Sequence, residues 1–130
     1  MWFQFALKRR YPSGLGEGTV DQAIVIRDRG GPGVLNCERV TVGAPGKGQV
    51  WLRHTAIGIN FHDCYVRSGL YTTLSLLGIP GLETVGVVDS VGPDVVDFSP
   101  GDRVGYITLE YGGYASARLM EASLLIRLPE

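Results

Sequence analysis

Side chains that can bind and polarise an oxygen atom gather between residues 60 and 71 of this chain. Asn60 carries an amide, and Tyr65 and Tyr71 carry phenols, so all three can donate a hydrogen bond. A donor held beside a carbonyl stabilises the negative charge that develops on its oxygen, and one such donor is worth about 2.7–4 kcal/mol. Asp63 and Arg67 lie among them and are expected to hold the segment in shape. The segment therefore predicts a site for chemistry at a carbonyl-type oxygen.

The sequence pattern changes from a strand to a short helix at Asn60. Residues 49–59 alternate, with the even-numbered side chains on one face of the expected strand. Asn60 is a favoured N-cap residue, and Asp63 stands where a carboxylate completes a capping box. Asp63 and Arg67 have the i, i+4 spacing of an intrahelical ion pair worth about 0.2–0.5 kcal/mol. Gly69 is expected to end the helix after about two turns.

Glycine and proline divide the remaining chain into short strands, since the 130 residues include 19 glycines and 7 prolines. The valine-rich stretch 83–91 contains Gly86, which is typical of a strand that another backbone approaches closely. Short strands with one short helix predict a mainly β fold with short helices, a small barrel in a single domain. The expected strands are residues 22–27, 34–42, 49–59, 83–91, 104–108, 113–119 and 124–128.

Two segments carry a resemblance to a known family. They read AIGINFHDCYVRSGLY (residues 56–71) and IPGLETVGVVDSVGPDVVDFSPGDRV (residues 79–104). Together they resemble the N-terminal catalytic domain of the medium-chain dehydrogenase/reductase superfamily, and within it the zinc-independent quinone oxidoreductases. The resemblance covers roughly residues 22–130 and implies the partly open GroES-like β-barrel, with residues 1–21 as a flexible leader or extension.

The resemblance also implies roles for the residues of the segment 60–71. Similar enzymes transfer a hydride from NADPH to a quinone or an α,β-unsaturated carbonyl, and the matching asparagine and tyrosines lie beside the nicotinamide. We therefore expect Asn60, Tyr65 and Tyr71 to be catalytic, Asn60 and Tyr65 to bind the cofactor, and Asp63 and Arg67 to support them. The plainer alternatives are that Asn60 only caps the helix and that Tyr71 is a half-buried aromatic.

No metal is expected at this site. In the zinc-containing alcohol dehydrogenases, the positions that match Asn60 and Leu82 hold a cysteine and a histidine that bind zinc. An amide is a poor zinc ligand and an isobutyl group is none, so Glu83 alone cannot make a site. The chain has only two cysteines, Cys37 and Cys64, which excludes the four-cysteine structural zinc loop.

Three other patterns are interpreted as structural. His62 and Cys64 are two residues apart on the expected helix and point to opposite sides, so we expect a surface histidine and a small buried thiol. His54 shares a strand face with apolar residues and is expected to be a satisfied core or edge residue. The turn at residues 43–48 (GAPGKG) lacks the spacing and the Ser/Thr of a phosphate-binding loop.

The glycine-rich βαβ unit that binds a dinucleotide is missing from the sequence, so the nucleotide-binding (Rossmann) domain is expected to be absent. The resemblance implies that the chain stops where these enzymes enter that domain, as a fragment of a longer enzyme or a truncated relative. Two alternatives stay open. The chain could belong to a related enoyl reductase, or it could be a non-catalytic GroES-like interaction module.

Composition excludes several other partners. A net charge of −1 gives no electrostatic case for nucleic acid or an anionic membrane, and no apolar run reaches the ~20 residues of a membrane span. Two cysteines are too few for a disulfide framework, so a cytoplasmic location is expected. The acid-free leader with Lys8, Arg9 and Arg10 is also compatible with a mitochondrial address. Relatives pair through the domain missing here, which leaves a homo-oligomer open.

Overall fold

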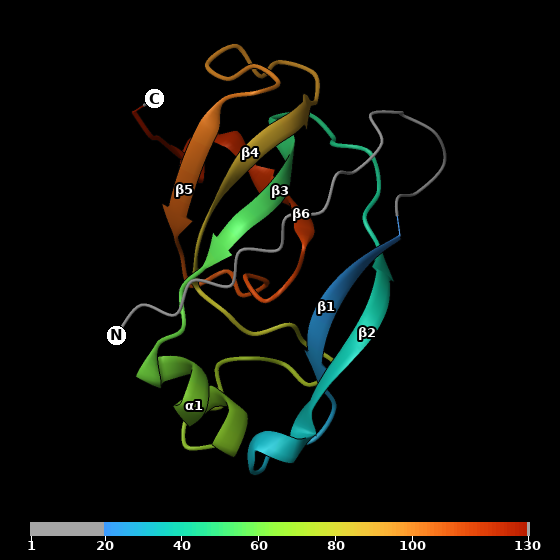
Figure 1. The fold of residues 1–130 in the computed structure, drawn as a ribbon, viewed down its shortest axis with the longest axis vertical. Coiled ribbons are helices and arrows are strands. Elements are labelled where there is room, and N and C mark those ends of the chain that lie inside the picture. Colours follow the sequence, from blue (N-terminus) through green and yellow to red (C-terminus); the bar gives the residue numbers. More distant parts are fainter. Residues whose placement is uncertain (1–19, 130) are drawn as a thin grey trace.

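The computed structural model describes residues 20–129, and they form two antiparallel sheets and one α-helix (Figure 1). The fold is mainly β and its sheets do not close into a complete barrel, as the GroES-like resemblance implies. The strands are β1 (Val20–Ile26), β2 (Leu35–Thr41), β3 (Gln49–Ile57), β4 (Glu83–Val91), β5 (Arg103–Ile107), β6 (Ala117–Glu121) and β7 (Ile126–Arg127), and the helix is α1 (Phe61–Ser68). Short 3₁₀ turns cover Pro32–Val34 and Ala122–Leu124. No helix among these residues is long and apolar enough to cross a membrane.

The larger sheet holds the main core. Its strand order is β6-β3-β4-β5-β7, and every neighbouring pair is antiparallel. The alternation predicted for residues 49–59 is confirmed where the sheet is deepest, because Val50 and Leu52 are fully buried. They pack with four more buried side chains from β4, β5 and β6, namely Val88, Val104, Tyr106 and Met120.

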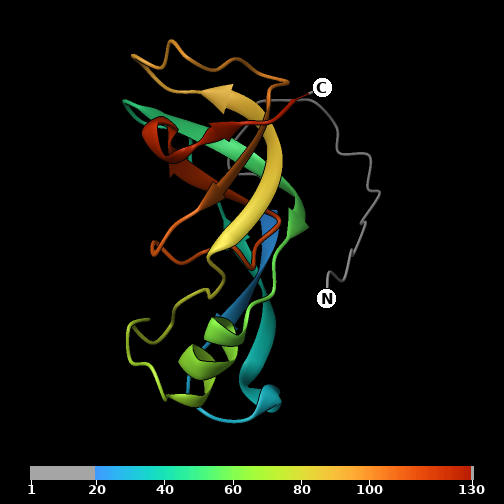
Figure 2. The same ribbon diagram turned by 90° about the vertical axis from the view of Figure 1, so that its left-hand side faces the viewer.

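The smaller sheet, β1 with β2, carries the helix. Isolated bridges join β1 to Ala115 and to Gly78, so the ribbon is tied to the segments before β6 and before β4. Ile26, Val66 and Leu74 form a second core between β1, α1 and the loop after α1. Figures 1 and 2 both show α1 beside the end of the β1–β2 ribbon, below the larger sheet.

Gly86 confirms the close approach predicted for β4. A Cβ atom built on Gly86 would lie 2.2 Å from the carbonyl oxygen of Arg53 and 3.1 Å from a methyl carbon of Leu52. The pairing of β3 with β4 shifts register between His54 and Ala56, at this point of the sheet. Only a residue without a side chain fits between these backbones.

The strand predicted for residues 113–119 is wrong in its first half, because regular pairing with β3 begins at Ala117. Gly113 and Tyr114 instead donate backbone hydrogen bonds to Gly81 and Pro80, which turns this stretch toward β4. The other predicted strands differ from the structure by a few residues at their ends, and β4 has the predicted bounds. Residues 1–19 of the predicted leader lie outside the described residues, and β1 begins at Val20.

The structure confirms that His54 is a satisfied histidine, half-buried on β3. Its Nδ1 donates to the carbonyl of Ala115 at 2.7 Å, and its Nε2 accepts from the Tyr106 hydroxyl at 3.2 Å. Burial lowers the pKa of His54 to about 4, and the positive charge of Arg118 acts in the same direction. The ring is therefore held in its neutral form.

We expect His54 to make the chain less stable in acid. Between pH 6.5 and pH 4 the unfolded state binds a proton at this residue that the folded state does not, so the stabilisation is complete above pH 6.5 and falls as pH falls. The loss between pH 7 and pH 5 is about 2 kcal/mol from this residue. Urea unfolding at both values, compared with His54→Gln, measures it. An equal acid loss in the variant would contradict the prediction.

Candidate functional site

The predicted helix begins and ends as the sequence indicates. Asn60 is the N-cap of α1 with an extended backbone, and it forms a capping box with Asp63. At the other end Gly69 adopts a left-handed conformation, with φ of 91°. Its N–H donates to the carbonyls of Tyr65 and Val66. The junction of β3 with α1 is therefore a tight turn that holds Asn60 at the end of the larger sheet.

Asn60 is held by two carboxylates. Its backbone N–H donates to Oδ2 of Asp63 at 2.8 Å, and its side-chain Nδ2 donates to Oε2 of Glu83, the first residue of β4, at 3.2 Å. The predicted capping role is confirmed, so the backbone of Asn60 serves the helix. The amide reaches across to the neighbouring strand.

Asp63 does not form the predicted ion pair with Arg67. It is 4% exposed, and Oδ2 accepts a second hydrogen bond from the Tyr114 hydroxyl at 2.9 Å. Among residues 20–129 no salt bridge joins Asp63 to Arg67, and buried atoms of both, Oδ1 of the aspartate and Nη1 of the arginine, have no hydrogen-bond partner. The prediction failed because the helix turns Asp63 inward, toward Tyr114. Burial and then the negative charge of Asp63 raise the pKa of the Tyr114 phenol far above its usual value, which keeps it a donor.

Tyr114→Phe is expected to destabilise the chain by about 2 kcal/mol, because a buried carboxylate loses a neutral donor and keeps its charge. Chemical unfolding of the variant measures this loss. In an Asp63→Asn background the same change should cost clearly less, since hydrogen bonds to neutral acceptors are weaker. Equal costs in the two backgrounds would show that the bond to Asp63 is not the reason.

Tyr65 and Tyr71 lie against each other at the far end of α1. Their rings are 5.3 Å apart between centroids in an edge-to-face arrangement, and the N–H of Tyr71 donates to the carbonyl of Tyr65 at 3.1 Å. The side chains are 39% and 43% exposed, so both phenols can be reached from solvent. The structure brings these two predicted residues together and places Asn60 at the opposite end of the same short helix. Their catalytic and cofactor-binding roles stay predictions.

His62 belongs to the same aromatic group, a contact that its sequence pattern does not predict. Its ring is 5.4 Å from Tyr71 and 6.0 Å from Tyr111, and its Nε2 is 2.9 Å from the Tyr111 hydroxyl. The interpretation of His62 as a plain surface histidine is therefore wrong. Cys64 is exposed and not the buried thiol that was expected. Tyr111 lies 49 residues from His62, so no local pattern signals this contact.

Arg29 is a second residue beside the candidate site that the sequence did not single out. Its guanidinium donates to the carbonyls of Val66, Tyr71 and Leu74. These bonds fix the end of α1 and the loop that carries Tyr71. The left-handed Gly69 leaves room for it, because a Cβ there would lie 2.8 Å from Cδ of Arg29.

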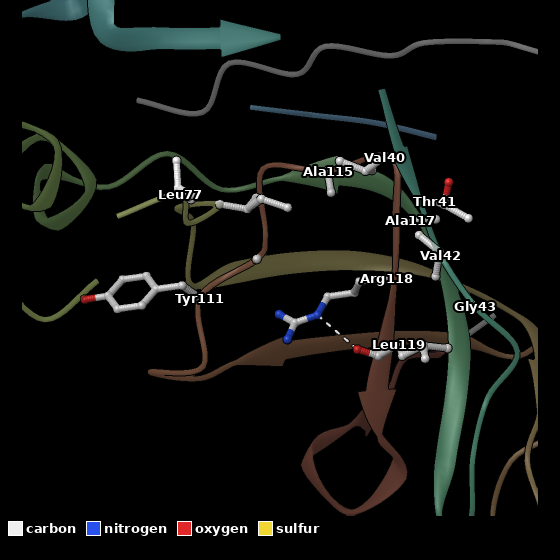
Figure 3. Close-up of a pocket in the computed structure, with 12 residues that line it drawn as sticks. Val40, Thr41, Val42, Gly43, Leu77, Tyr111, Ala115, Ala117, Arg118 and Leu119 are labelled. Atoms are coloured by element: carbon white, nitrogen blue, oxygen red, sulfur yellow. Dashed lines mark hydrogen bonds between the residues drawn. The ribbon is translucent and has the colours of Figure 1, made fainter. Parts of the chain in front are cut away.

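A separate hollow of about 440 Å³ opens between β2, β6 and the loops near residues 77 and 111 (Figure 3). In Figure 3 the Arg118 side chain extends into it, and its Nε donates to the carbonyl of Leu119. None of Asn60, Tyr65 and Tyr71 lines this hollow, although Tyr111 does. The hollow is therefore not the predicted site. Within residues 20–129, no three His, Cys, Asp or Glu side chains lie close enough to hold a metal ion.

Comparison with known proteins places this fold in a family. Residues 46–130 match the model of the alcohol dehydrogenase GroES-like domain. A 2-haloacrylate reductase of Burkholderia sp is 46% identical over 112 residues, which are 83% of this chain and 33% of that protein. Quinone oxidoreductase 1 of Escherichia coli K12 is 39% identical over 106 residues, 82% of this chain and 32% of that protein. The chain thus spans about a third of the length of the curated relatives it matches.

Solved structures agree with the sequence comparison. The crystal structure of a 2-haloacrylate reductase matches with a TM-score of 0.76 and 43% identity over 84% of this chain and 32% of that one. Escherichia coli quinone oxidoreductase in complex with NADPH matches with a TM-score of 0.79 and 38% identity, over 83% of this chain and 33% of that one. The chain belongs to the alcohol dehydrogenase GroES-like domain family, within the medium-chain dehydrogenase/reductase superfamily.

Proposed function

We propose that this chain is the substrate-side part of an NADPH-dependent, zinc-independent oxidoreductase that reduces a quinone or an α,β-unsaturated carbonyl. The similarity to quinone oxidoreductases of several organisms supports this reaction class, and so does the likeness to one solved with NADPH. The chain corresponds to about a third of those proteins, so the activity is proposed for a protein that also contains a nucleotide-binding domain.

One observation carries the proposal: hydrogen-bond donors gather on the strand–helix junction and on the helix that follows. Nδ2 of Asn60 has two N–H groups, and Glu83 accepts from one of them. The phenols of Tyr65 and Tyr71 are partly exposed, side by side. These N–H and O–H groups can donate hydrogen bonds to the hydroxyl and carboxamide oxygens of a cofactor. They can also donate to the polarised oxygen of an acceptor. When bound, NADPH supplies the hydride. The residues of this chain orient the acceptor and stabilise the negative charge on its oxygen.

The donor set also supports a mechanism without zinc. The two positions that bind zinc in alcohol dehydrogenases hold Asn60 and Leu82 here, and neither is a good zinc ligand. The nearby carboxylate of Glu83 already accepts from the side-chain amide of Asn60, and that of Asp63 accepts from its backbone N–H. Hydrogen bonds would then do the work that a Lewis acid does in the zinc enzymes.

A second candidate substrate is an unsaturated acid rather than a quinone. The observation that favours it is the 46% identity to a 2-haloacrylate reductase, compared with 37–41% for the quinone oxidoreductases. In this case the hydride would add to a carbon–carbon double bond conjugated with a carboxyl group. The same donors would stabilise charge on the carboxyl oxygen.

A chimera tests the proposal. Residues 20–130 replace the matching third of Escherichia coli quinone oxidoreductase 1, and NADPH consumption is followed with a quinone and with 2-chloroacrylate. We expect turnover with at least one acceptor, and the faster one identifies the substrate class. A chimera that folds and binds NADPH but reduces neither acceptor would contradict the proposal.

The non-catalytic alternative is tested on the 130-residue chain alone. NADPH fluorescence is titrated with the chain, because a bare interaction module has no reason to bind the cofactor. Saturation at micromolar cofactor would refute the module. An inactive chimera combined with no cofactor binding by the chain would favour it.

A further inference from the structure

We propose that Glu83 is a positioning residue that fixes the orientation of the Asn60 amide, and that residue 58 is glycine because the Glu83 carboxylate occupies the space of its side chain. The contact itself is independent of the proposed function. Its consequence for a ligand rests on that function, since it assumes that Asn60 faces the cofactor and the acceptor.

Glu83 reaches Asn60 from the neighbouring strand. The end of β3 and the start of β4 are joined there by the N–H of Gly58, which donates to the carbonyl of Glu83 at 2.9 Å. The side chain of Glu83 turns back over this pair, and Oε2 lies 3.2 Å from Nδ2 of Asn60. A carboxylate can only accept hydrogen bonds, so the amide must present its NH₂ group, and not its oxygen, to Glu83.

Gly58 supplies the room for this contact. A Cβ atom on residue 58 would lie 2.6 Å from Oε2 of Glu83, 2.8 Å from Cδ and 3.1 Å from Cγ. Gly58 is not among the glycines with positive φ, so its backbone conformation is open to other residues. The requirement for glycine is therefore one of space, and the atoms that a methyl group would displace belong to the carboxylate that holds Asn60.

The orientation decides what Asn60 offers a ligand. Glu83 accepts from one N–H of the amide, while the backbone N–H of Asn60 donates to Asp63. One N–H of the amide remains, a donor for an oxygen that gains negative charge. Without Glu83 the amide is free to rotate and to present its oxygen, which would repel such an atom. By accepting from one N–H, Glu83 thus makes the amide offer its other N–H, and not its oxygen, to a ligand.

NMR spectra of the ¹⁵N-labelled 130-residue chain test the contact without any cofactor. The matched pair is Glu83→Met, which keeps the length of the side chain but cannot accept, and Glu83→Gln, which can accept through its amide oxygen. We expect hydrogen exchange of the Asn60 side-chain amide to become about tenfold faster in Glu83→Met and in Gly58→Ala, and to stay near the wild-type rate in Glu83→Gln. Gly43→Ala is the control for Gly58→Ala, because a Cβ at Gly43 meets nothing within 4 Å.

The outcomes separate this proposal from the proposed function. If Glu83→Met leaves the exchange of the Asn60 amide unchanged in a chain whose backbone spectrum is native, Glu83 does not position it. If Glu83→Met does not fold, the comparison of Gly58→Ala with Glu83→Gln still tests the contact. The first displaces the Glu83 carboxylate from Asn60, and the second keeps an oxygen that can accept from it. In the active chimera, Glu83→Met should lower kcat about tenfold with Glu83→Gln close to wild type. A faster-exchanging amide with unchanged kcat would confirm the contact and remove Asn60 from the reaction.

Discussion

Replacing Gly86 with alanine is expected to cost the chain about 4 kcal/mol or more, enough to unfold a large fraction of it. The new methyl carbon would lie 2.2 Å from the carbonyl oxygen of Arg53, an atom of the neighbouring backbone that cannot rotate away. The two strands would have to separate at the register shift between His54 and Ala56. Overpacking against side chains costs about 1–3 kcal/mol, and a clash with backbone is more severe.

Thermal and urea unfolding of Gly86→Ala measure the effect, with Gly43→Ala as the matched control. Both substitutions add one methyl group to a glycine without positive φ, but a Cβ at Gly43 has no atom within 4 Å. We expect the control to change the free energy of unfolding by less than about 1 kcal/mol. A stable Gly86→Ala variant would mean that β3 and β4 can pair in another register.

The sequence was most informative where a structure is fixed by residues close together in the chain. The helix α1 begins at Asn60 and ends at Gly69 because the cap and the left-handed glycine are local signals. The strand β4 has its predicted bounds because turn residues flank a run of valines. Gly86 revealed the closeness of a second backbone, although the sequence could not say that it is Arg53.

The site was predicted less completely, because its contacts join distant segments. Tyr114 holds Asp63 from 51 residues away, and Tyr111 contacts His62 from 49 residues away. The predicted i, i+4 ion pair of Asp63 with Arg67 did not form, because Asp63 bonds to the distant Tyr114 instead. The burial of Asp63 explains this difference, because a buried carboxylate needs a hydrogen-bond donor, and the Tyr114 hydroxyl lies beside it. The roles of Asn60, Tyr65 and Tyr71 came from the family resemblance and need activity measurements.

The network around Asn60 links the stability of the fold to the chemistry proposed for it. Asp63 joins the helix cap to Tyr114, and Glu83 joins the amide to β4. Both carboxylates act on one residue, through different atoms. A substitution at Asn60 therefore disturbs the cap and the donor together, and an experiment has to separate the two effects.

Asn60→Ser separates them, and in the chimera it is expected to lower kcat by about 10²–10³-fold while the melting temperature stays near that of wild type. Serine caps a helix as well as asparagine does, so the helix should persist. Its hydroxyl is too short to keep the contact with Glu83 and still offer a donor, and loss of one such donor costs about 2.7–4 kcal/mol in the transition state.

Asn60→Ala should lose the same activity and in addition about 1 kcal/mol of stability. Asn36→Ala is the matched control, because within residues 20–129 this side chain on β2 bonds only to the carbonyl of Val34, in the 3₁₀ turn before the strand. Steady-state NADPH oxidation with saturating acceptor gives kcat for each variant. Full turnover by Asn60→Ser would leave Asn60 as a helix cap and nothing more.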